Sequence, residues 1–213
     1  MTPQQAQPAA VRRNLATVTV IWVIALIVSG IAPRDRLTWF MEVAPVLIAL
    51  PLLLATRDRF PFTALAYALV CIHGLILIVG AAYTYAHVPA GFWVQEWLGF
   101  ERNPYDRLGH FAQGFIPAIV AREILIRTFR LAPGKFLFFI TTSICLAVSA
   151  FYELIEWWSA LVLGQGAHEF LGTQGDEWDT QWDMFLALVG ACTAQLALSR
   201  LHDRQIATLE AKK

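Results

Sequence analysis

Six long apolar segments, separated by short polar stretches, constrain this chain more than any other feature of its sequence. A helix needs about 20 apolar residues to cross the ~30 Å hydrocarbon core of a bilayer. The segments cover residues 15–33, 37–56, 61–84, 107–128, 136–160 and 181–200. Only 15% of the residues are charged, whereas a soluble domain typically carries about 25%. We therefore expect an all-α, polytopic membrane protein with about six spanning helices in a single domain, residues 1–213.

The positions of Lys and Arg predict how the helices are oriented. Basic residues gather on the cytoplasmic side of a membrane, and a topology with both termini inside places 12 of the 16 Lys and Arg residues there. Residues 1–14 and 201–213 are then cytoplasmic tails, and 86–106 and 161–179 are outer-face loops. The stretch Gly91–Phe100 is too short to span but rich in aromatic residues, which predicts an interfacial helix or lid.

The formal net charge of zero hides a strong asymmetry between the two faces. In the predicted topology, the outer side holds 12 of the 16 acidic residues and only 4 basic ones. Asp and Glu contribute little to membrane orientation, so topology does not account for this excess of acid. Function is therefore best sought on the outer face.

Three groups of ionisable residues lie in or beside the outer ends of apolar segments. They are Asp106 with His110, Glu153 with Glu156, and Asp176 with Asp179 and Asp183. Within each group the residues are three or four apart along the chain, so each group occupies one helix face. The predicted topology brings the three helices to the same depth, which indicates one shared polar pocket.

Buried carboxylates in such a pocket cannot all stay ionised unless a cation or shared protons compensate their charge. Oxygen ligands with one imidazole suit Mg²⁺, Mn²⁺, Fe²⁺ or Zn²⁺. The candidate ligands are Asp106, His110, Glu153, Glu156, Asp179 and Asp183, with Asp176 at the rim. The candidate catalytic groups are His110, Glu153 and Asp183. A simpler alternative for Asp106, Asp176 and Asp179 is that they cap or begin helices.

Other ionisable residues in the apolar segments have simpler interpretations. His73 stands alone in its segment, which favours a structural hydrogen bond. Arg122 and Glu123 lie near an inner end and are expected to snorkel or to pair. Glu42 lies near the outer end of the second segment and is a secondary candidate for the pocket.

Neither the cysteines nor the outer Gly-rich loop indicates a separate site. Cys71, Cys145 and Cys192 lie in apolar runs without CxxC spacing, which favours buried apolar roles over a disulfide framework or a zinc ribbon. His168 and Glu169 belong to a loop that we expect to be solvated. The sequence contains no Gly-rich phosphate loop, HExxH or GxSxG motif.

These observations leave three functional hypotheses open. The leading one is a metal-dependent membrane enzyme that hydrolyses, or transfers a group from, a lipid-linked or envelope substrate. The second is a cation- or proton-coupled transporter, and the third is a non-catalytic scaffold with a structural cation site. Each implies membrane lipids as partners, and the balanced charge argues against nucleic acid.

The ionisable groups also carry a family resemblance. The runs NPYDRLGHFAQGF, SAFYELIEWW and GTQGDEWDTQWDMF resemble the YjdF-type family of bacterial inner-membrane proteins. This resemblance implies a multi-pass protein of the inner membrane. The pattern is more distantly similar to the VanZ-like family, which implies a role in the cell envelope without a defined reaction. Asp106, His110, Glu153 and Asp179 match that family's helix motifs, whereas Arg107, Glu156 and Asp183 replace its lysine, glutamine and asparagine.

Overall fold

A computed structural model describes residues 9–164 and 168–211, and every regular element in this part of the chain is a helix. The helices are α1 (Ala9–Ile31), α2 (Arg36–Thr56), α3 (Ala64–Tyr83), α4 (Pro89–Leu98), α5 (Tyr105–Arg127), α6 (Lys135–Leu163), α7 (His168–Leu171) and α8 (Asp179–Glu210). The predicted all-α class is confirmed.

Five of these helices, α1, α2, α3, α6 and α8, are long and apolar enough to cross a membrane by length and composition. The predicted fourth span corresponds to α5, which is not among these five helices. It carries ionisable residues at both ends, and these lower its mean hydropathy. Its 23 residues extend about 34 Å at ~1.5 Å per residue. It packs against α3, α6 and α8, so its polar groups face protein.

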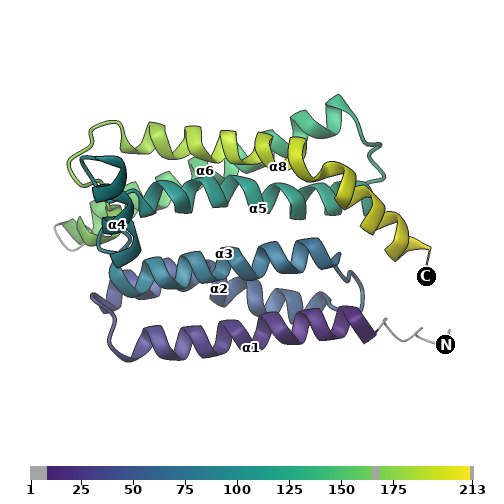
Figure 1. Cartoon of the computed structure of the whole chain (residues 1–213), viewed down its shortest axis with the longest axis horizontal. Helices are drawn as coiled ribbons and strands as arrows, with labels where there is room; N and C mark the ends of the chain where they lie inside the picture. The colour runs from purple at the N-terminus through teal and green to yellow at the C-terminus, as the bar shows by residue number, and fades with distance from the viewer. Residues whose placement is uncertain (1–8, 165–167, 212–213) are drawn as a thin grey trace.

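The long helices form two layers (Figure 1). One layer holds α1, α2 and α3, and the other holds α5, α6 and α8, with α3 packed against α5 between them. The first and last described residues lie toward one end of the bundle, whereas α4 lies at the other end (Figure 1). This arrangement agrees with the prediction that both termini face the same side.

Side-chain caps begin two of the spanning helices. The Asp35 carboxylate accepts a hydrogen bond of 2.7 Å from the backbone N–H of Thr38 at the start of α2, and this bond lowers the pKa of Asp35. The Thr63 hydroxyl accepts one of 3.2 Å from the Ala66 N–H at the start of α3. Each cap satisfies a backbone donor that has no partner within its helix.

The last helix is longer than hydropathy predicts. The predicted span ends at residue 200, and residues 201–213 were expected to form a polar tail. Instead α8 continues to Glu210, with His202 and Ile206 buried. Charged residues end the apolar run but do not interrupt backbone hydrogen bonding, so the helix continues beyond the last apolar segment.

Two glycines bring α5 and α8 into backbone contact. A Cβ atom at Gly114 would lie 1.8 Å from the Ala187 carbonyl oxygen, and one at Gly190 would lie 2.2 Å from the Phe111 oxygen. Small residues allow this close approach between membrane helices. The close packing holds the outer turns of α5 and α8 side by side, which is where the acidic groups lie.

Candidate functional site

The outer ends of α5, α6 and α8 meet around the imidazole of His110. Its Nε2 atom is 3.5 Å from Asp106 Oδ1 and 3.6 Å from Asp183 Oδ2, and its Nδ1 atom is 3.9 Å from Glu153 Oε1. All four residues are buried, with at most 8% of their surface exposed. The structure therefore brings together one member or more of each predicted group.

Helical periodicity explains why Glu153 reaches this centre. On α6 the buried residues Thr141, Cys145, Ser149 and Glu153 are four apart, so they form one stripe that faces the bundle. Trp157 would continue this stripe, but it is 55% exposed. Glu153 is therefore the outermost buried residue of the stripe.

Two overlapping sets of side chains have the spacing needed to hold a metal ion. In each set, one potential ligand atom per residue lies within 4.8 Å of the others. The sets are Asp106, His110 and Asp183, and His110, Glu153 and Glu156. His110 belongs to both, so the imidazole is the centre of the cluster.

Several acceptor atoms in this cluster have no hydrogen-bond partner within the described residues. They include Glu153 Oε1 and Asp183 Oδ1. A buried polar atom without a partner costs roughly 1–3 kcal/mol, and more when it is charged. A proton, a water molecule or a cation at these atoms would remove this cost.

Arg102 closes the cluster on its outer side, and sequence analysis did not identify it. Its guanidinium group lies 3.4 Å from Asp106 Oδ2 and 3.6 Å from Asp176 Oδ2, contacts Asp179, and donates to the Thr173 carbonyl at 2.8 Å. Asp179 and Asp176 therefore pair with an arginine at the rim. The available signal was an arginine in an otherwise acidic outer loop, four residues before Asp106.

Asp176 ties the loop before α8 to α5. The Trp178 backbone N–H donates to Asp176 Oδ1 at 2.9 Å, and Arg107 lies 3.1 Å from Oδ2. The hydrogen bond from Trp178 lowers the pKa of Asp176, and the positive charges of Arg102 and Arg107 act in the same direction. Asp176 is therefore an ionised rim residue.

A cavity of about 230 Å³ opens beside His110 between α2, α3, α5 and α6. Glu42 lines it and is only 5% exposed, and the Tyr152 hydroxyl donates to Glu42 Oε2 at 3.3 Å. His73 also lines the cavity, but its Nε2 atom has no partner among the described residues. The structural hydrogen bond expected of His73 is therefore not made at Nε2 within the described residues.

A second buried ionic cluster lies at the opposite end of α5 and α8. Glu123 is fully buried, and its carboxylate accepts from the Thr63 N–H at 3.0 Å, the Thr63 hydroxyl at 2.7 Å, and the Arg127 guanidinium. His202 Nε2 lies 3.0 Å from the same carboxylate, and Arg122 lies 2.7 Å from Asp203. Arg122 therefore pairs with Asp203, and Glu123 pairs with Arg127 and His202. Pairing was one of the two roles predicted for these residues. His202 was missed because it follows the last apolar segment.

The predicted interfacial segment forms the short helix α4. Trp93 and Trp97 are four residues apart and are 72% and 83% exposed, so they share one outward face. The side chains of His168 and Glu169, the other loop candidates, lie outside the described part of the structure.

Comparison with known proteins agrees with this architecture. Residues 14–204 match the family model described as "Predicted membrane protein (DUF2238)". The chain belongs to this family. It is 56% identical to the inner membrane protein YjdF of Escherichia coli (strain K12), over 94% of each chain. No solved structure matches the chain.

Membership in this family confirms two predictions from the sequence. The chain is a multi-pass inner-membrane protein, and its resemblance to the YjdF-type family is real. The family description and the relative's name specify no reaction, ligand or metal.

Proposed function

We propose that the His110 cluster binds a divalent cation at the outer face of the membrane, and that the bound metal supports hydrolysis or group transfer. The observation that carries this proposal is the buried imbalance of charge around His110. Asp106, Glu153 and Asp183 surround one imidazole, and Arg102 is the arginine that contacts this group. A divalent cation would compensate the excess negative charge and satisfy the acceptor atoms that lack partners.

The surroundings of His110 favour one side of the ring for the metal. The Gln113 side-chain oxygen lies 3.2 Å from His110 Nδ1, and with the proton on Nδ1 this contact is a hydrogen bond that the amide oxygen accepts. A metal-binding histidine typically donates its other N–H in this way, which fixes the tautomer. The Nε2 lone pair then faces Asp106 and Asp183, so these two carboxylates and Nε2 are the proposed first ligands.

Glu153 Oε1 lies 3.9 Å from His110 Nδ1, and Glu156 belongs to the same set of neighbouring ligand atoms. In this proposal the two glutamates serve proton transfer. A divalent cation held at the cluster would lower the pKa of a water bound to it, and a neighbouring carboxylate could then act as the general base that takes the proton. Ligands of this type suit Mg²⁺, Mn²⁺, Fe²⁺ or Zn²⁺. Glu153 is the better candidate, since one of its oxygens lacks a partner in the described residues.

The adjoining cavity supports a substrate with an apolar part. Beyond the acidic groups, its walls include Pro45, Leu77, Pro117 and Val148, which belong to four different helices. A polar head at His110 and an apolar chain along these residues fit a lipid-linked or envelope substrate. A small, fully polar substrate would leave these apolar walls without contacts.

Two variants separate metal binding from chemistry. We expect Asp183→Asn to lose the metal, measured by elemental analysis of purified protein. We expect Glu153→Gln to keep the metal but to lose conversion of a membrane-lipid substrate, measured by mass spectrometry of an inner-membrane lipid extract after incubation. Absence of a bound divalent cation in the wild-type protein, together with full activity of Glu153→Gln, would contradict the proposal.

Cation- or proton-coupled transport is the second candidate, and one observation favours it. Buried ionic clusters lie at both ends of the α5–α8 pair, around His110 and around Glu123. Between them, however, the two helices touch through backbone atoms at Gly114 and Gly190, which leaves no room for an ion along that interface. A flux assay in proteoliposomes distinguishes the candidates, because the enzyme should move no ion.

A further inference from the structure

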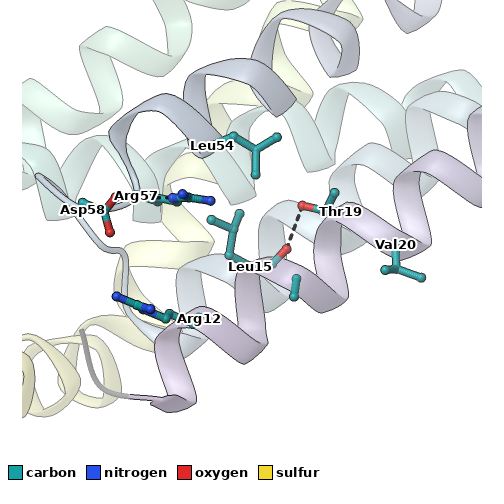
Figure 2. Close-up of a pocket in the computed structure, with 8 residues that line it drawn as sticks. Arg12, Leu15, Thr19, Val20, Leu54, Arg57 and Asp58 are labelled. Atoms are coloured by element: carbon teal, nitrogen blue, oxygen red, sulfur yellow. Dashed lines mark hydrogen bonds and ion pairs between the residues drawn. The ribbon is translucent and has the colours of Figure 1, made fainter. Parts of the chain in front are cut away.

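We propose that a groove between the predicted cytoplasmic ends of α1 and α2 binds an anionic diacyl phospholipid. The groove has a volume of about 420 Å³ and lies at the end of the bundle opposite the His110 cluster. Figure 2 shows Arg12 on α1 and Arg57 at the end of α2, with Leu15 between them; Leu54 also lines the groove. The lipid phosphate would lie between the two arginines.

The arginines are held in place by the helix ends. Arg12 lies in the first turn of α1, and Arg57 is the residue that ends α2. The Arg57 Nε donates to Asp58 at 3.3 Å, which orients the guanidinium group. Both arginines are exposed, so a lipid headgroup can approach their guanidinium groups. Guanidinium groups suit phosphate because their paired N–H donors match its oxygens.

The apolar wall of the groove distinguishes a lipid from a soluble anion. Leu15 is buried at its base, whereas Val20 and Leu54 are 57% and 36% exposed. Val20 lies two helical turns further into the membrane than Arg12, so the wall leads from the charged end toward the hydrocarbon core. An acyl chain would cover these side chains, and free phosphate would not.

Charge favours an anionic lipid over a zwitterionic one. Two arginines and one aspartate line the groove, which leaves an excess of one positive charge. Basic residues on the cytoplasmic side are also drawn to the anionic lipids of that leaflet. Phosphatidylglycerol carries a net negative charge and phosphatidylcholine does not, so the groove should prefer the former.

The test is lipid binding to the purified full-length protein in detergent, followed by native mass spectrometry during titration with each of these two lipids. We expect wild-type protein to prefer phosphatidylglycerol. Arg12→Gln and Arg57→Gln should each weaken its binding about five-fold, which corresponds to ~1 kcal/mol per basic residue near an anionic surface. The matched control is Arg13→Gln, because Arg13 is exposed on the same turn but does not line the groove; it should bind like the wild type.

Three results would overturn the proposal. The first is equal binding of both lipids by the wild type. The second is an equal loss in Arg12→Gln and Arg13→Gln, which would show a general surface-charge effect. The third is that glycerol phosphate displaces bound phosphatidylglycerol at the same concentration at which that lipid binds. A headgroup without acyl chains would then bind as well as the whole lipid. Size-exclusion elution of each variant as a single peak verifies that it is folded.

Discussion

The Nε2 atom of His110 lies 3.6 Å from Oδ2 of Asp183, across the interface where α5 and α8 make backbone contact. The two residues come from helices far apart in the sequence, and their distance depends on how closely the helices pack. The glycines that allow this contact lie one to two turns further along each helix than the ionisable residues. Helix packing and site geometry are therefore coupled.

We expect Gly114→Ala and Gly190→Ala to destabilise the protein and to weaken cation binding together. The new Cβ would lie 1.8 Å from the Ala187 oxygen in the first variant, so α5 and α8 must separate. Overpacking of this kind typically costs about 1–3 kcal/mol, occasionally more. Thermal unfolding in detergent measures the loss. Gly134→Ala is the matched control, since a Cβ there meets nothing within 4 Å, and a similar loss in this variant would contradict the explanation.

We expect Arg102→Gln to bind a divalent cation more tightly than the wild type. The guanidinium group of Arg102 lies 3.4 Å from Asp106, so its positive charge opposes a second cation at the cluster. Removing a charge at this range should strengthen binding several-fold, corresponding to ~1 kcal/mol or more at an intermediate dielectric constant. Isothermal titration calorimetry with Mn²⁺ measures the change. Weaker binding in the variant would mean that Arg102 supports the site through loop structure rather than opposing the ion.

We expect Glu123→Ala to be among the most destabilising single substitutions at the inner end. It leaves Arg127 and His202 buried without their shared carboxylate and removes the acceptor for Thr63. Breaking a buried ion pair from one side costs about 3–5 kcal/mol. Unfolding measurements should show this loss, whereas cation binding by the fraction that remains folded should be unchanged. Loss of both properties in folded protein would show that the two clusters are coupled.

The ion pairs of Asp176 should stabilise the outer loops only above acidic pH. Because hydrogen bonding and nearby arginines lower the pKa of Asp176 from its usual 3.8, its stabilising effect is fully present above 3.8. The effect disappears as the pH falls through the lowered pKa. Asp176→Asn should therefore unfold at a lower temperature than the wild type at pH 7, and the difference should shrink below pH 3.8. A difference that persists unchanged in acid would contradict the role of the ionised carboxylate.

The part of the site that sequence could predict depends on regular spacing. Asp106 with His110, and Asp179 with Asp183, are each four apart within or beside an apolar run, so a helix places each pair on one face. Alternating helix directions then place the outer ends of three helices together. The four-residue spacing and the alternating helix directions were together enough to predict a cluster that includes Glu153.

Residues that reach the site singly could not be predicted in this way. Arg102 lies in a loop and His73 is isolated in its helix, so no spacing pattern marks them. Glu42 is isolated as well, and only its position near the outer end of its segment made it a secondary candidate. The positions of all three follow from how α2 packs on α3 and α3 packs on α5, and from the fold of the outer loops. Hydropathy likewise could not predict that α8 continues to Glu210, because the apolar signal ends where charged residues begin.

The central claim is that the His110 cluster binds a divalent cation, and calorimetric titration of metal-stripped protein with Mn²⁺ or Zn²⁺ tests it most directly. We predict one bound ion per chain in the wild type, and a loss of at least ten-fold in affinity for Asp183→Asn, in line with the removal of a charged ligand. Glu177→Gln removes an exposed carboxylate from the same face and should bind like the wild type. No binding by the wild type, or equal affinity in all three proteins, would contradict the claim.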